Sequence, residues 1–283
     1  MEYLTGQILK PYRINELGQV LFTDGTNVDM IANQVTCEAY GYTYDIVSQT
    51  CIAFRFNGNL EQNENNASSK NQINGDGNST QLGSNTSQIN GTRNVLRGFN
   101  NNCLINGSGN EIAYGVSNSF VGGRMAEVTA DQSIVLGGNA FSNTIIGNRQ
   151  SIQLMYGTRT TNGTNTVSYL NNDGSSLFAV PENTVMYFHA DVVAVRVGGS
   201  AASGAVGDFA SWVERGVIIN ESGSMTVSRE RDDIKSNGAT SNWRPTGINS
   251  DTNFAMRVRG DTDMNVEWLS NITFTQIKTG VSL

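Results

Sequence analysis

Histidine and cysteine are scarce in this 283-residue chain, which has one histidine and three cysteines. The histidine, His189, lies far along the chain from all three cysteines, and a structural zinc site needs about four ligands of these types. No serine, histidine and aspartate set stands out, and no glycine loop carries the Lys-Ser/Thr ending of a phosphate-binding loop. We therefore expect neither a metal nor a cofactor.

The cysteine count is odd, which argues against a disulfide framework. Cys37 and Cys51 are nevertheless close enough in the sequence to close a small loop. A disulfide between them and a pair of free thiols are both left open by the sequence.

Charge is also scarce. Only 15% of the residues are charged and the formal net charge is −7, which argues against a nucleic-acid partner because phosphate binding relies on clustered Lys and Arg. No run of 18 apolar residues occurs, and the amino terminus lacks a basic stretch followed by an apolar core. We expect no membrane span and no signal peptide.

A glycine-ended repeat of about eight residues occupies positions 71 to 157. The residue two before each glycine is nearly always apolar, which predicts a short strand and a corner in every unit, with one side chain pointing inward. The expected shaft core is Ile73, Ile89, Leu96, Ile105, Phe120, Val135 and Ile145.

One such unit is too small to bury its apolar residue, so neighbouring units must stack. Units with one inward hydrophobe suit a prism in which three copies of the chain each supply one face. This predicts a homotrimer with closed cyclic symmetry. A parallel β-solenoid made by one chain also uses Gly and Asn at its corners, so it remains the alternative.

Four segments follow from the sequence pattern. Strand-like pieces fill residues 1–56, and the polar stretch 57–70 reads as a linker. The repeat gives a shaft over 71–160. β-Branched and aromatic runs separated by turn signals predict an antiparallel β-sandwich of jelly-roll type over 165–283.

These features resemble bacteriophage fibre proteins. The apolar-x-Gly units resemble the triple β-helix of phage tail needles and fibre shafts, and the later units SFVGG, SIVLGG and TIIG are similar to the β-roll heads of trimeric autotransporter adhesins. The order of features over 165–283 resembles the β-sandwich tip of many phage fibres. The resemblance implies an all-β homotrimer in the virion, on the tail or the head, which docks through residues 1–56 and contacts a host glycan or protein with its tip.

Surface recognition is the function that the sequence favours. Arg229, Arg231, Trp243 and Arg244 lie in the loops predicted at the tip, where an aromatic ring beside charged groups can contact a sugar. The alternative is a solvated loop with Trp243 folded back onto the sandwich.

We expect the chain not to be an enzyme. A polysaccharide-cleaving tip is one alternative, for which Asp191 and Glu214 are the two candidate carboxylates. A purely structural head or neck fibre without a host ligand is another.

Overall fold

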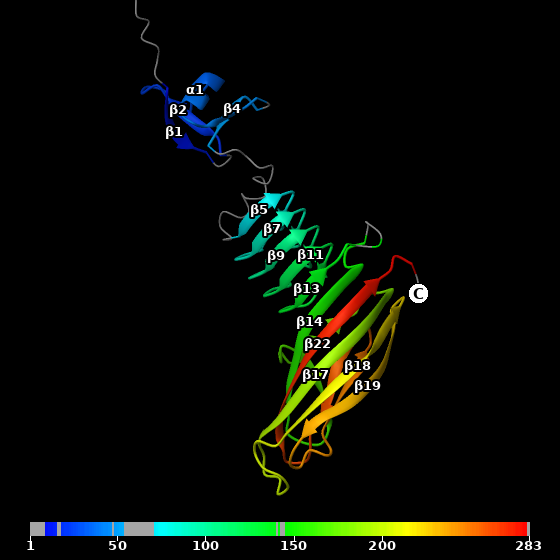
Figure 1. The fold of residues 1–283 in the computed structure, drawn as a ribbon. Helices are drawn as coiled ribbons and strands as arrows, with labels where there is room; N and C mark the ends of the chain where they lie inside the picture. The colour runs from blue at the N-terminus through cyan, green and yellow to red at the C-terminus, as the bar shows by residue number, and fades with distance from the viewer. Residues whose placement is uncertain are drawn as a thin grey trace, which may run out of the picture. The chain divides into compact units, whose positions relative to one another are not determined.

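The structure is a computed structural model that describes residues 9–15, 18–46, 48–53, 71–139, 141 and 145–281. The chain divides into two compact units, Met1–Asn65 and Asn66–Leu283 (Figure 1). The predicted linker, 57–70, lies outside the described residues. Within the described residues, no helix has the length and the apolar character needed to cross a membrane.

The first unit has a small core of its own. It contains β1 (Lys10–Ile14), β2 (Val20–Thr23), α1 (Gln34–Ala39), β3 (Thr43–Asp45) and β4 (Thr50–Ile52). Helix α1 begins after Asn33, whose side chain accepts a hydrogen bond from the Thr36 N–H and so satisfies one free donor of the first turn. Cys37 of α1 forms a disulfide with Cys51 of β4, and both are buried against Phe22.

The second unit begins with a β-solenoid whose coils take sixteen residues each, except that β13 follows β11 by fourteen. Strands one coil apart pair in parallel, so that Ile73 lies beside Ile89 and Ile89 beside Ile105. One sheet of the solenoid consists of β5 (Gln72–Asp76), β7 (Gln88–Thr92), β9 (Leu104–Ser108), β11 (Phe120–Arg124) and β13 (Ile134–Gly137). The other consists of β6 (Ser79–Thr80), β8 (Val95–Leu96), β10 (Glu111–Ile112) and β12 (Glu127–Val128).

The intertwined three-chain shaft predicted from the repeat is wrong for this segment. Two eight-residue units, one on each sheet, complete a coil within one chain. Leu96 and Ile112 of the second sheet are as fully buried as Ile89 and Ile105 of the first, all at 0% exposure. A core therefore forms without help from another copy, and the one-chain solenoid that the sequence left as the alternative is what the chain builds.

Four of the expected shaft-core residues, Ile89, Leu96, Ile105 and Val135, are buried in the solenoid. Ile73 is half-buried because β5 is the end strand of the described solenoid, where no described coil covers its outer side. Ile145 lies between β13 and the next strand, after the chain has left the coils, and it is also half-buried. Its assignment to the solenoid core is wrong.

Phe120 is also wrongly assigned to the core. It is half-buried on β11, whereas the adjacent Val121 is fully buried and aligned with the inward residue of β9. The glycine of β11 that aligns with Gly107 is Gly123 and not Gly122. Counting back two positions from the wrong glycine of this Gly-Gly pair selects the outward residue.

Five longer strands continue the first solenoid sheet in the order β19-β18-β17-β22-β14-β13, as Figure 1 shows. They are β14 (Arg149–Thr160), β17 (Thr184–Gly198), β18 (Phe209–Glu221), β19 (Ser224–Ser236) and β22 (Asn265–Lys278). Strand β14 makes the transition, because it pairs antiparallel with β13 on one side and β22 on the other. Backbone hydrogen bonding is thus continuous from the coils into this large sheet.

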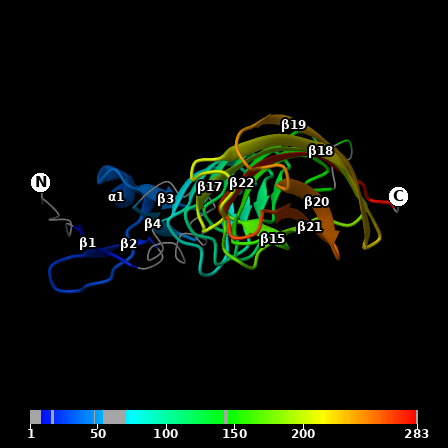
Figure 2. The same cartoon turned by 90° about the horizontal axis from the view of Figure 1, so that it is seen from below.

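A smaller sheet packs on the inner face of the large one (Figure 2). It consists of β15 (Asn165–Leu170), β16 (Phe178–Ala179), β20 (Arg244–Ser250) and β21 (Asn253–Arg259). Phe254 of β21 contacts Phe188 of β17 and Phe274 of β22, with ring centroids 5.0 and 5.3 Å apart. We call these two layers the two-layer body. Its core is continuous with that of the solenoid.

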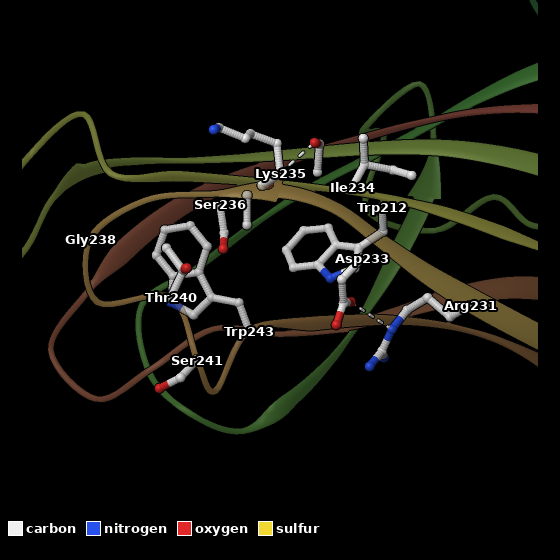
Figure 3. Close-up of a pocket in the computed structure, with 12 residues that line it drawn as sticks. Trp212, Arg231, Asp233, Ile234, Lys235, Ser236, Gly238, Thr240, Ser241 and Trp243 are labelled. Carbon is white, nitrogen blue, oxygen red and sulfur yellow. Dashed lines mark hydrogen bonds and ion pairs between the residues drawn. The ribbon is translucent and has the colours of Figure 1, made fainter.

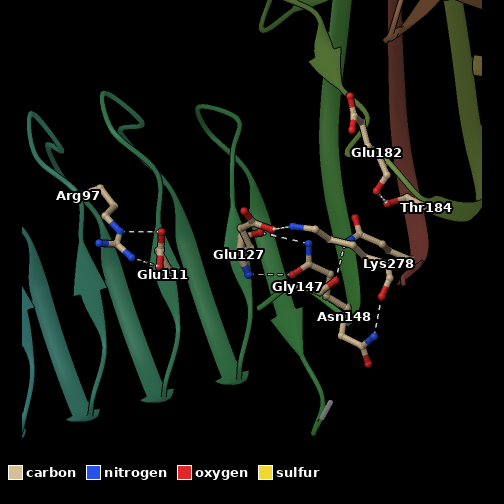
Figure 4. A network of polar contacts seen from close by, with 10 residues as sticks. Arg97, Glu111, Glu127, Gly147, Asn148, Glu182, Thr184 and Lys278 are labelled. Carbon is tan, nitrogen blue, oxygen red and sulfur yellow. Dashed lines mark hydrogen bonds and ion pairs between the residues drawn. The ribbon is translucent and has the colours of Figure 1, made fainter. Parts of the chain in front are cut away.

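Polar contacts hold the last coil against the end of β22 (Figure 4). The Lys278 ammonium lies 2.6 Å from a carboxylate oxygen of Glu127 on β12. The Asn148 amide donates to the Lys278 carbonyl at 2.6 Å, and the Gln150 side chain both donates to and accepts from the Glu127 backbone. The solenoid and the two-layer body are therefore joined by side chains as well as by the shared sheet.

Candidate functional site

The two sheets of the body separate at one edge, between β19 and β20. Strand β19 pairs only with β18, and β20 only with β21, among the described strands. From Arg229 to Ser236 every residue of β19 is exposed, although alternate residues of a strand covered on one side would be buried. Open space therefore lies beneath this half of β19.

Tryptophan side chains form part of the wall of a hollow of about 400 Å³ at this edge (Figure 3). Trp212 stacks on Trp268 with ring centroids 5.6 Å apart, and Trp243 lies 6.0 Å from the same ring. Trp243 is only 3% exposed. It is therefore folded back onto the body, which is the alternative that the sequence left open to an exposed contact residue. Its Nε1–H is buried and has no hydrogen-bond partner.

A second hollow of about 470 Å³ lies beside Glu214 of β18. The Glu214 side chain is 1% exposed, and its Oε1 accepts a hydrogen bond from the Gly247 N–H at 2.6 Å and lies 3.2 Å from Arg229 Nε. Its Oε2 is buried without a partner. Burial raises the pKa of the Glu214 carboxyl, although the Gly247 N–H, Arg229 and Arg231 all act to lower that pKa.

Three of the four predicted contact residues lie around these hollows. Arg231 lines both, Arg229 lines the hollow beside Glu214, and Trp243 lines the other. Arg244 is exposed on β20 and lines neither. Trp212 was missed, although its signal is present in the sequence: it lies in the inward phase of the alternation on β18, as Glu214 does.

Asp191 and Glu214 do not form the carboxylate pair that a polysaccharide-cleaving tip was expected to use. In the β17–β18 register, Ala190 is opposite Glu214 and Asp191 is opposite Val213. Ala190 and Glu214 are buried, whereas Asp191 is exposed, its side chain at 62%. Successive residues of a strand point to opposite faces, so the two carboxylates lie on opposite sides of the large sheet.

The outer face of the large sheet is apolar in two bands. Val193 of β17 is beside Leu269 of β22, and these side chains are 46% and 52% exposed. Nearer the other end of the strands a second band consists of Tyr187, Val217, Ile219 and Ile277, all exposed. Between the bands lie His189, Asp191 and Arg215, with Asp191 3.3 Å from the histidine ring. Contiguous apolar surface of this kind marks an interaction site in soluble proteins.

No family model matches the chain, and no curated protein sequence does. Among solved structures it is similar to phage tailspike proteins. The tailspike of Acinetobacter baumannii phage AM24 is 10% identical with a TM-score of 0.27, over 75% of this chain and 50% of that one. The tailspike of Acinetobacter phage vB_ApiP_P1 is 10% identical with a TM-score of 0.20, over 73% and 46%.

A third such structure is the tailspike gp49 of Acinetobacter baumannii bacteriophage Fri1, a capsular polysaccharide depolymerase, at 5% identity and a TM-score of 0.24 over 73% of this chain and 46% of that one. The chain spans about half the length of these tailspikes. The β-solenoid of residues 71–137 agrees with the repetitive β-helical shaft predicted from the sequence.

The expectation that the chain is not an enzyme has to be corrected. The tailspike of phage Fri1 is a capsular polysaccharide depolymerase and therefore an enzyme. Scarcity of histidine does not exclude this chemistry, because cleavage of a glycosidic bond can rely on carboxyl groups alone.

Proposed function

We propose that the chain is a fibre or tailspike component of a phage virion that assembles as a homotrimer and attaches to the host surface. Residues 1–56 would dock on the particle, and the two-layer body would act as a β-sandwich tip. The observation that carries this proposal is the exposed apolar face of the large sheet, together with the tailspike resemblance.

The solenoid no longer supplies the reason for trimerisation, because its coils close within one chain. The outer face supplies another. Val193 and Leu269 point away from the core of their own chain and are about half exposed, so covering them would contribute roughly half of the 1.5–3 kcal/mol of a fully buried side chain, about 1 kcal/mol each. A polar band between two apolar bands would fix the register of the contact, since buried polar groups need partners.

Light scattering after size exclusion tests the assembly. We expect a mass near three chains of 30.5 kDa. The double variant V193D/L269E should shift this mass to one chain, because it places carboxylates in the apolar band. The matched control is Thr129→Glu, which adds a carboxylate at an exposed position of the solenoid. A single-chain mass for the unaltered protein contradicts the trimer.

Competition tests attachment to the host. Purified chain should block adsorption of the phage that carries it, whereas a purely structural head or neck fibre would leave adsorption unchanged. Deleting 165–283 is a poor test, because β14 would lose its partner β22 along twelve residue pairs.

Polysaccharide cleavage is the second candidate function, and Glu214 is the observation in its favour. A buried carboxyl group with a raised pKa is suited to act as a general acid. Release of reducing ends from host capsule, lost in E214Q, would support it. No release by the assembled protein would contradict it.

A further inference from the structure

Two buried polar atoms without partners belong to residues that line the hollows beneath β19. Buried donors and acceptors are nearly always hydrogen-bonded in native proteins, and leaving one unpaired costs about 1–3 kcal/mol. Glu214 Oε2 and Trp243 Nε1 are both unpaired, and each belongs to a residue that lines one of the two hollows. Arg231 lines both hollows, so the two adjoin. We call them together the edge groove.

We propose that the edge groove binds a neutral oligosaccharide of the host surface, with Glu214 as an acceptor and Arg231 as a donor to its hydroxyl groups. This inference rests on the proposed attachment function and assigns a site and a ligand class to it.

The mixture of donors and acceptors points to hydroxyl groups. Arg229 and Arg231 can only donate, an ionised Glu214 can only accept, and Thr246 can do both. A phosphate can satisfy only the donors, and an ammonium group only the acceptor. A sugar hydroxyl donates and accepts at once, so a sugar can satisfy both kinds of group in one hollow.

The charges around the groove indicate a neutral sugar. Two arginines and two carboxylates line it, namely Arg229, Arg231, Glu214 and Asp233. The Glu230 carboxylate instead pairs with Arg215 of the outer face. The charges that line the groove already neutralise one another. Arg229 lies 3.2 Å from Glu214, and Arg231 lies 3.5 Å from Asp233 (Figure 3). An acidic sugar would have to displace a carboxylate from these arginines.

The tryptophan cluster suits the same ligand. Trp212 and Trp243 are 5% and 3% exposed, so they supply a rigid wall and the unpaired Trp243 Nε1–H donor rather than an open ring face. In the hollow of Figure 3 the Trp243 indole lies beside the hydroxyl-bearing side chains of Thr240 and Ser241, and the Trp212 indole lies beside Asp233. The room in the two hollows, about 400 and 470 Å³, is within the range of ordinary ligand pockets, so more than one sugar residue fits along the groove.

A printed array of neutral and acidic bacterial surface oligosaccharides tests the proposal, with the full chain as the probe. We expect binding to neutral glycans that persists in about 0.5 M salt. At this ionic strength the Debye length is only a few Å, so attraction between distant charges is screened. Arg231→Ala and E214Q should each lower the apparent affinity at least about tenfold, which corresponds to the loss of about 1.4 kcal/mol. Arg244→Ala is the matched control, because Arg244 is exposed on β20 outside the groove.

Intrinsic fluorescence gives a second readout. The three tryptophans of the chain form one cluster, so a shift of their emission on adding the bound glycan reports on this groove. Melting temperatures of the variants show whether the fold is intact. If either Arg231→Ala or E214Q is unfolded, the folded one of the two supplies the test.

Several outcomes would overturn the inference. They are no bound glycan, binding confined to acidic glycans, or equal binding by Arg231→Ala and Arg244→Ala. Adsorption competition distinguishes failure of the groove as a glycan site from failure of the proposed attachment function. If Arg231→Ala blocks phage adsorption as well as the unaltered chain does, attachment stands and the groove is not its site. If neither protein blocks adsorption, attachment itself is wrong.

Discussion

At the scale of single residues, Asn94 shows how one side chain connects three coils of the solenoid. It is fully buried, and its Nδ2 donates to Asn78 Oδ1 at 3.0 Å and to the Gly107 carbonyl at 2.9 Å. Its Oδ1 accepts from the backbone N–H and from the side chain of Asn110, both at 3.1 Å. An asparagine can do this because its amide both donates and accepts.

Replacing Asn94 by Ala should therefore lower the free energy of unfolding by about 3 kcal/mol. The substitution leaves buried backbone groups without hydrogen-bond partners, and each such group costs about 1–3 kcal/mol. Chemical denaturation measures the change. Asn90→Ala is the control, since Asn90 is half-buried and accepts only from the neighbouring Asn74 and Gln88 side chains. We call the stacked buried side chains of Asn78, Asn94 and Asn110 the inner ladder. An equal loss in both variants would mean that this ladder contributes no more to stability than an outer asparagine does.

Glu214 makes stability depend on pH. Burial raises its pKa in the folded chain above the ordinary value of 4.5, so between these two pKa values the folded state binds more protons than the unfolded state. The free energy of unfolding then falls as pH rises through this window and levels off above the folded pKa. The E214Q variant should lack this fall. Melting temperatures of both proteins from pH 4 upward provide the test, and parallel profiles would contradict it.

At the scale of elements, the corners set how closely coils approach. Gly91 has a φ of +125°, and a Cβ built on it would lie 1.8 Å from the Gly107 carbonyl oxygen. Gly115 also has a positive φ, +77°, but nothing lies within 4 Å of its Cβ position.

Gly91→Ala should consequently cost more than about 3 kcal/mol, above the range of most single substitutions. Gly115→Ala should cost about 1–2 kcal/mol from the left-handed backbone alone. Unfolding of the two variants side by side separates close approach from backbone strain. If Gly115→Ala is the more damaging, the corner contact does not limit the stacking.

The sequence predicted the elements of the solenoid better than their pairing. The eight-residue spacing and the inward residues Ile89 and Ile105 could be read directly, because the apolar-x-Gly pattern recurs in every unit. The sixteen-residue coil was also encoded: Asn74, Asn90 and Asn106 precede the glycine in every second unit only. Which units lie side by side depends on contacts across the coil, and a local pattern does not specify those.

The edge groove was harder to predict for a related reason. Arg229, Arg231 and Trp243 attracted notice as residue types, but they come together only because the smaller sheet ends short of β19. Glu214 was noted as a carboxylate within a strand. Its burial beside Gly247 depends on a strand more than thirty residues later, as the separation of 33 shows.

At the scale of the whole molecule, the two units have separate cores and only the first holds a disulfide. The remaining cysteine, Cys103, is buried in the solenoid as a free thiol, and burial raises its pKa. Reducing conditions should therefore act on one unit alone.

Reduction should lower the stability of the first unit by about 3 kcal/mol, the value expected for a loop of about 15 residues in the chain-entropy model. Calorimetry with and without reductant should show the first unit's transition moving down while that of the second stays in place. Cys103→Ser is the control and should leave the first unit's transition unchanged. A shift of both transitions on reduction would mean that the units do not unfold independently.

The sixteen-residue offset between neighbouring coils makes the length of the solenoid modular. Removing residues 88–103 would place Leu104 where Gln88 now pairs with Gln72, and would place Asn110 beside Asn78, so the inner ladder would stay in register. Each coil gained or lost would change the distance between the two ends of the solenoid by one strand spacing, about 4.8 Å. Insertions or deletions of whole coils therefore give a family of related chains a way to vary reach in fixed steps while the end contacts stay the same.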